Sequence, residues 1–208
     1  MESRRNLVLP ILVSLVVFVA SSSPAVKAQS AEQLFRDAAA VEDRGDLTKA
    51  LELYEELVRR EPNSVSVRGN YGVALAKAGR YRDAIAQYYE ALRHDPGNAM
   101  VRLNLALAEY KQADLSNAIA ELKRLRNEQP ENRQVLYLLA DCYLRLGQNR
   151  DAINLLAPFY EQDPDDRAID YAYGTALIRD GSTNKGERIQ FGNEARRTSI
   201  IRLACGRS

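Results

Sequence analysis

Histidine, cysteine and tryptophan are almost missing from this chain of 208 residues. It has one histidine, His94, two cysteines, Cys142 and Cys205, and no tryptophan. A single histidine cannot build a multi-histidine metal site, and His94 stands directly before Asp95 and Pro96, a sequence typical of a surface position at a helix end. We therefore expect no metal site, and we do not expect the two cysteines to form a disulfide.

Patterns that support catalysis or cofactor binding are also missing. Acidic pairs such as Glu55 and Glu56 are adjacent in sequence, which is typical of solvated charge rather than of a catalytic pair. No glycine-rich loop has the pattern that binds phosphate. The sequence therefore predicts a protein that is not an enzyme and has no cofactor.

Neither sign of charge dominates the chain. Residues 1–28 contain Arg4, Arg5, Lys27 and Glu2, so the remainder has 26 basic and 27 acidic residues out of 29 and 28 in the whole chain. Nucleic-acid binding needs a basic patch or stripe, and this balance offers no electrostatic case for one. We expect no nucleic-acid partner.

The N-terminal segment has the order of a signal peptide. Arg4 and Arg5 precede an apolar run from Leu7 to Ala20, and small polar residues follow as far as Gln29. Ala28, with Val26 two positions before it, suits a signal peptidase, so we expect residues 1–28 to be removed and the mature chain to be exported to the periplasm or secreted. The apolar run is shorter than the roughly 20 residues that span a bilayer.

Two alternatives to this interpretation stay open. An uncleaved leader would anchor the protein to the membrane, which would then be its only membrane contact. The pair Arg4 and Arg5 also allows a twin-arginine export signal instead of the general secretory route. Either route places the mature chain outside the cytoplasm.

Proline recurs at a fixed interval of 34 residues, and other residue types recur with it. Proline cannot continue a helix, so each repeat of Pro62, Pro96, Pro130 and Pro164 predicts a helix end. Small residues stand twelve and twenty-four positions before each proline, with a turn residue between them, which predicts two closely packed helices. The small residues are Ala38 and Ala50, Gly72 and Ala84, Ala106 and Ala118, and Ala140 and Ala152, and the turn residues are Gly45, Gly79, Ala113 and Gly147.

The repeated unit resembles the tetratricopeptide repeat (TPR). The period, the small residues, the terminal proline and a bulky residue at the twenty-fourth position (Tyr54, Tyr88, Leu122, Leu156) all fit that family, over Ala31 to about Gly181. The resemblance implies an all-α, right-handed α-solenoid of stacked helix-turn-helix units. Residues 31–64, 65–98, 99–132 and 133–166 form four full units, and 167–181 a partial fifth. The chain departs from the family pattern at Leu34, Arg68, Arg102, Leu136 and Asn149.

The resemblance also implies a concave groove lined by the first helix of each unit. The positions that face it carry one apolar and aromatic stripe and one basic stripe. The first consists of Leu103, Leu107, Tyr110, Tyr137, Leu144 and Tyr171, and the second of Lys77, Lys111, Arg145 and Arg179. We expect the groove to bind an extended or helical protein segment with apolar anchors and acidic residues. The alternative is that the tyrosines fill gaps between units and the basic residues are solvated helix ends.

A carboxylate clamp of the kind found in chaperone adaptors of this family is not expected. The first unit has Phe35 and Ala39 where such a clamp needs lysine and asparagine.

The C-terminal residues 182–208 depart from the repeat. Arg167 to Arg179 predicts a fifth first helix, but Gly186 and Gln190 replace the expected alanine and bulky residue, so we expect no second helix there. This basic tail is a diverged cap, a disordered segment or the remnant of a longer array. An unshielded end would favour self-association.

These observations lead to one preferred function and two alternatives. We expect an exported, non-catalytic scaffold or assembly factor that binds other proteins. A structural protein that self-associates end to end, or an accessory subunit of a cell-envelope enzyme complex, are the alternatives.

Overall fold

A computed structural model describes residues 29–163 and 166–191, and every regular element in these ranges is a helix. The helices are α1 (Ala31–Asp43), α2 (Leu47–Arg60), α3 (Val65–Lys77), α4 (Tyr81–His94), α5 (Ala99–Lys111), α6 (Leu115–Glu128), α7 (Arg133–Arg145), α8 (Asn149–Gln162), α9 (Arg167–Arg179) and a further segment at residues 183–191. Within these ranges, no helix has the length and apolar character that crossing a bilayer requires.

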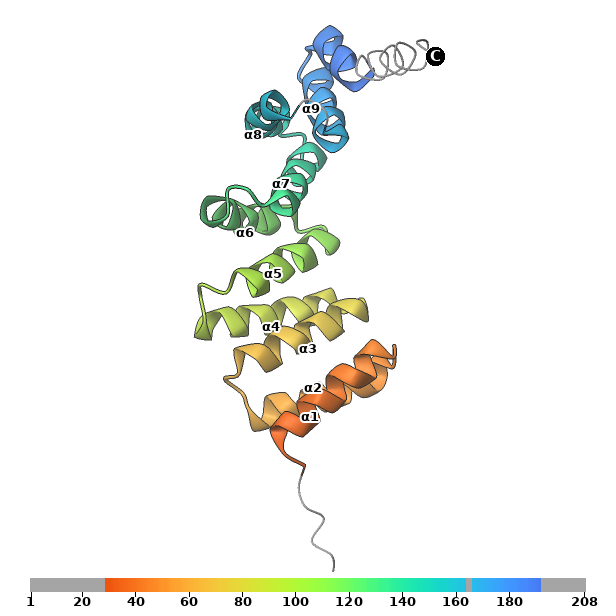
Figure 1. The fold of residues 1–208 in the computed structure, drawn as a ribbon, viewed down its shortest axis with the longest axis vertical. Coiled ribbons are helices and arrows are strands. Elements are labelled where there is room, and N and C mark those ends of the chain that lie inside the picture. Colours follow the sequence, from red (N-terminus) through yellow and green to blue (C-terminus); the bar gives the residue numbers. More distant parts are fainter. Residues whose placement is uncertain (1–28, 164–165, 192–208) are drawn as a thin grey trace, which may run out of the picture.

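The helices stack in sequence order into an elongated array. Each helix packs on the next along the chain, with α1 and α2 at one end and α9 at the other (Figure 1). The expected all-α solenoid of helix pairs is confirmed. The predicted leader at 1–28, Pro164 and the chain after residue 191, including Cys205, lie outside the described residues.

Helix starts follow the 34-residue period. Ser30, Ser64, Asn98, Asn132 and Asp166 each precede a first helix, and each side chain accepts a hydrogen bond from the backbone N–H three residues later. These contacts satisfy N–H groups that have no partner inside the helix. The N-cap is therefore part of the repeat.

Helix ends follow the period as well. The second helices α2, α4 and α6 end two residues before Pro62, Pro96 and Pro130, as expected from the proline spacing. The turn inside each pair uses a residue with positive φ, which is glycine in every unit except the third. There Ala113 has φ 64°, a left-handed conformation that is energetically less favourable for a residue with a Cβ than for glycine.

The repeated small residues lie where the two helices of a unit approach each other. Ala38, Ala50 and their counterparts through Ala152 are buried, as are the bulky residues at the twenty-fourth position. Gly72 shows why the position must be small: a Cβ there would lie 2.4 Å from a ring carbon of Tyr88. The missing side chain leaves the space that the Tyr88 ring fills.

Arginine at the fourth position, a departure from the family pattern, has a structural role. The Arg68 Nε donates a hydrogen bond to the Pro62 carbonyl at 2.6 Å, and its NH1 donates to Gln87 Oε1 at 2.8 Å. In the next unit Arg102 repeats this arrangement with the Pro96 carbonyl and with Glu121 Oε2, the latter at 2.7 Å. Each arginine thus links the two helices of its own unit to the proline turn that precedes the unit, through hydrogen bonds from its guanidinium group.

The expectation that the fifth unit has no second helix is wrong. Residues 183–191 are helical and pack on α9, with Gly186 and Ile189 buried. Gly186 does not break the helix; a Cβ there would lie 2.6 Å from the Gly174 carbonyl oxygen and 2.6 Å from Ile178 Cγ1. Gln190 replaces the bulky residue by donating hydrogen bonds to the Tyr171 carbonyl and Thr175 Oγ1. The glycine pair and the glutamine therefore extend the helical array beyond Gly181.

Replacement of Gly186 by alanine is expected to destabilise the packing of residues 183–191 on α9 by about 1–3 kcal/mol, the usual cost of overpacking. The added Cβ would meet the backbone of α9, which cannot move as a side chain can. Hydrogen exchange of the amides in residues 183–191 should become faster in Gly186→Ala, while amides of α3 to α6 stay unchanged. Gly97→Ala is the control, since a Cβ at Gly97 meets nothing closer than 3.8 Å. Equal exchange in both variants would contradict this account of the glycine pair.

Candidate functional site

Two adjoining hollows lie between α3 and α5. The first is a pocket of about 300 Å³, and the second, of about 410 Å³, shares Val73 and Asn104 with it. The first pocket is lined by Val73, Ala76, Lys77, Tyr81, Tyr88, Asn104, Leu107, Ala108 and Lys111. The second is lined by Val65, Ser66, Gly69, Asn70, Val73, Asp95, Asn98, Met100, Val101 and Asn104. We call the two hollows together the α3–α5 groove.

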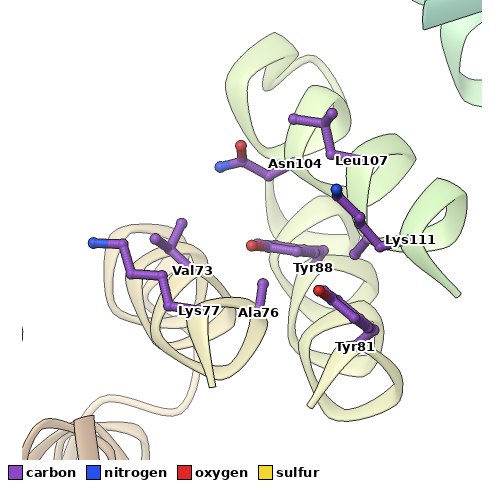
Figure 2. Close-up of a pocket in the computed structure, with 9 residues that line it drawn as sticks. Val73, Ala76, Lys77, Tyr81, Tyr88, Asn104, Leu107 and Lys111 are labelled. Atoms are coloured by element: carbon purple, nitrogen blue, oxygen red, sulfur yellow. The ribbon is translucent and has the colours of Figure 1, made fainter. Parts of the chain in front are cut away.

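Three helices build the first pocket. α3 contributes Val73, Ala76 and Lys77, which share one helix face because they are three and four residues apart. α5 contributes its own face on the other side, with Leu107 at the centre. α4 contributes Tyr81 and Tyr88, whose hydroxyl groups point into the space between α3 and α5 (Figure 2).

The pocket combines apolar walls with a few polar groups. Val73, Ala76, Leu107 and the tyrosine rings supply carbon surface, and the Asn104 amide faces the same space (Figure 2). Burial of Tyr88, which is 1% exposed, together with the charge of Glu42, raises the pKa of Tyr88 above its ordinary value, so its hydroxyl stays protonated. Such a mixture is typical of sites that bind an apolar group and fix its orientation.

The predicted basic stripe is largely engaged in contacts within the protein. Lys77 Nζ lies 2.7 Å from Glu42 Oε1 of the first unit, and Arg179 NH1 donates to the Leu144 carbonyl at 3.0 Å. Arg145 pairs with Asp141 Oδ2 at 2.8 Å and its guanidinium carbon lies 4.7 Å from the centre of the Tyr110 ring. Lys111 is exposed and has no ion pair with the residues that the structure describes.

The predicted apolar stripe is divided between packing and open surface. Tyr110 donates to Asp141 Oδ2 and Tyr137 donates to Asp166 Oδ2, each at 2.5 Å, so both hydroxyls are used in contacts between successive units. Leu103 and Leu144 are half-buried against the central core. Tyr171 is 69% exposed. Of the predicted residues, the structure brings Lys77, Leu107 and Lys111 together in one pocket. Partner contact stays a prediction for all ten.

Sequence reasoning did not assign Tyr81, Tyr88 and Asn104 to the site. The repeat places both tyrosines on the second helix of their unit, the side expected to pack inside the array. Tyr88 reaches the groove because Gly72 has no side chain to stop the ring. Glycine at position 72 together with the tyrosine at position 88 is the sequence feature that could have predicted a tyrosine in the groove.

In residues 29–163 and 166–191, no group of histidine, cysteine and acidic side chains could hold a metal ion. Cys142 is fully buried, and burial raises the pKa of its thiol to about 11, so it is not a reactive thiolate.

Comparisons with known proteins agree with the fold. Two family profiles described as tetratricopeptide repeat match the chain, one at residues 38–99 and the other at 75–142 and 109–174. No curated protein sequence matches it.

Solved structures show the same architecture. The crystal structure of MamA protein is similar with a TM-score of 0.71 and 19% identity, over 76% of this chain and 87% of that one. MamA 41-end from Desulfovibrio magneticus RS-1 has a TM-score of 0.69 and 20% identity, over 86% and 97%. YrrB, described as a TPR protein with an unusual peptide-binding site, has a TM-score of 0.68 and 18% identity, over 77% and 82%.

Identities this low show the fold alone, whereas the family profiles together span more than half of the chain. Such repeat folds support protein–protein interaction in general and are typically non-catalytic. The helix pairs, their 34-residue period and the matching profiles lead to one conclusion: this chain belongs to the tetratricopeptide repeat family.

Proposed function

We propose that this protein is an exported, non-catalytic scaffold that holds a segment of another protein in the α3–α5 groove. The observation that carries the proposal is the pocket of about 300 Å³ between α3 and α5, with apolar walls and inward-pointing tyrosine hydroxyls (Figure 2). Export is supported by the order of charge, apolar run and small residues in positions 1–28.

The dimensions of the groove suit a short segment of chain. Its lining residues extend from Val65 at the start of α3 to Lys77 at its end, and α3 has 13 residues. A helix of that length spans about 20 Å, which corresponds to about six residues of extended chain. The two hollows could therefore hold consecutive parts of one bound segment.

A peptide ligand also fits the chemistry of the walls. The second hollow presents the Asn104 amide, which can both donate and accept hydrogen bonds, and the Asn70 amide, whose nitrogen already donates to the Ser66 carbonyl at 2.9 Å. The Asn98 amide is used inside the protein, where it caps α5 and donates to Asp95. The first presents carbon surface for a side chain. YrrB, of similar fold, is described as having a peptide-binding site, which supports a peptide as the kind of ligand.

The test is selection of peptides from a phage-displayed library of random dodecapeptides on the purified protein. Ala76→Trp should fill the first pocket and weaken the selected peptides at least about tenfold, as expected when the centre of a binding site is blocked. Affinity is measured by fluorescence anisotropy. Ala120→Trp is the matched control because Ala120 is exposed on α6 and lines neither hollow. Equal affinities for both variants would show that the groove is not the binding site.

A further inference from the structure

The charges around the α3–α5 groove are unevenly distributed. The first pocket is lined by two lysines, Lys77 and Lys111, and by no acidic residue. The second hollow has Asp95 in its wall and no basic residue. The lysines stand at the C-terminal ends of α3 and α5, whereas Asp95 precedes α5. The groove therefore has a basic end and an acidic end.

The two lysines at the basic end are not equivalent. The Lys77 ammonium is held by Glu42, whose carboxylate is buried and also accepts a hydrogen bond from the Tyr54 hydroxyl at 3.1 Å. Figure 2 shows the Lys77 side chain extending away from Tyr81 and Tyr88. Lys111 has no such counter-ion within the described residues. A bound carboxylate would have to displace Glu42 from Lys77, but it would meet Lys111 without competition.

The pocket next to Lys111 has room for one large apolar side chain. Its volume of about 300 Å³ is at the lower limit of ligand pockets, which measure about 300–1,000 Å³. Val73 and Leu107 form opposite walls, and the Tyr88 ring closes the space between them (Figure 2). An apolar side chain seated there would place its neighbours in the bound chain near the Tyr81 hydroxyl and Lys111.

We infer that the α3–α5 groove recognises an acidic segment of another protein, in which an apolar anchor fills the pocket and an adjacent carboxylate binds Lys111. This inference rests on the proposed function and adds the chemistry and direction of the partner. The carboxylate lies over the end with Lys111, and the opposite end, beside Asp95, accepts neutral or basic residues. Lys111 is the specificity-determining cation of the basic stripe, and Lys77 is a structural residue.

The dodecapeptide library is also the probe for this inference, with sequencing of the selected peptides as the readout. Peptides selected by the wild-type protein should carry aspartate or glutamate beside a large apolar residue. Selection on Lys111→Glu should replace these acids by lysine or arginine. A selected peptide is then compared with a copy in which its glutamate is replaced by glutamine. This replacement should lower the affinity for the wild-type protein about fivefold, because partly exposed ion pairs contribute up to about 1 kcal/mol. It should not change the affinity for Lys111→Met.

One control separates Lys111 from the general charge of the protein. Lys123→Glu, a reversal at an exposed position of α6 that lines neither hollow, should change neither the acidic preference nor the thermal stability.

Other outcomes contradict either the acidic partner alone or the proposed function as well. Peptides without acidic residues, or with the same acids on wild type and Lys111→Glu, would overturn this inference and leave the proposed function standing. A library from which the wild type selects nothing would overturn both. If the protein instead sediments as a dimer that Ala76→Trp dissociates, the groove is occupied by a second copy and the inference is wrong.

Discussion

Replacement of Arg102 by methionine is expected to lower the free energy of unfolding by about 3 kcal/mol, since removing one partner of a buried ion pair leaves an uncompensated charge. Arg102 NH1 lies 2.7 Å from Glu121 Oε2, and both side chains are only 9% exposed. Arg124 also contacts Glu121, at 3.2 Å, but its side chain is 63% exposed and neutralises the carboxylate only partly. Urea denaturation followed by circular dichroism measures the change.

A double variant distinguishes the unpaired charge from a loss of packing. Arg102→Met with Glu121→Met removes both charges, and we expect it to regain most of the stability, because replacing a whole buried ion pair by apolar residues is often close to neutral. Arg124→Met should cost less than about 1 kcal/mol, as an exposed pair does. A double variant as unstable as Arg102→Met would contradict the electrostatic explanation.

The previous unit contains a neutral version of the same arrangement. Arg68 occupies the fourth position of its unit and bonds to Gln87, just as Arg102 bonds to Glu121 nineteen residues later. Removal of Arg68 leaves a neutral amide that is half-buried rather than a buried carboxylate. Arg68→Met should therefore cost less than Arg102→Met, which makes the two units an internal comparison.

The repeat allowed the helices, their ends and their turns to be predicted because these features depend on residues within one unit. Proline spacing placed the ends of α2, α4 and α6, and the glycine and Ala113 positions placed the turns. The same position-by-position reasoning failed at Gly186. The helix propensity of glycine is lower than that of alanine, but propensity does not include packing. Gly186 lies so close to the Gly174 backbone of α9 that a Cβ at this position would clash with it.

The groove was predicted less completely because its contacts join residues that do not repeat. A lysine or arginine stands at the thirteenth position of four units, but Glu42, Asp141 and the Leu144 carbonyl give three of these cations different partners. No periodic pattern contains that information. The repeat therefore located the face of the groove and left open which of its charges are free to bind.

Glu109 on α5 is a buried carboxyl group with a raised pKa. It is 1% exposed, its Oε1 accepts a hydrogen bond from the Tyr89 hydroxyl at 2.8 Å, and its Oε2 has no hydrogen-bond partner among the described residues. Burial raises its pKa to about 7, and the negative charges of Glu121 from α6 and Asp114 from the following turn act in the same direction. The Tyr89 hydrogen bond from α4 opposes this shift.

The raised pKa makes the stability of the array depend on pH. Below pH 4.5, the ordinary value for this group, Glu109 is protonated in both the folded and unfolded chain. As the pH rises, the unfolded chain loses the proton first, so the stabilising contribution of the protonated form decreases and is lost once the pH passes about 7. The total loss is at most about 3 kcal/mol, since each pKa unit corresponds to about 1.4 kcal/mol.

Replacing Glu109 with glutamine should remove this loss, because the amide stays neutral and its oxygen can still accept from Tyr89. We expect Glu109→Gln to be about 2–3 kcal/mol more stable than wild type at pH 8 and nearly equal to it at pH 4.5, measured by urea denaturation across that range. Glu128→Gln, at an exposed position of α6, is the matched control and should show no such difference. Tyr89→Phe tests the cause independently: without its hydroxyl the pKa of Glu109 rises further, so the loss of stability should extend to higher pH. A constant difference between Glu109→Gln and wild type across this range would show that Glu109 does not titrate there.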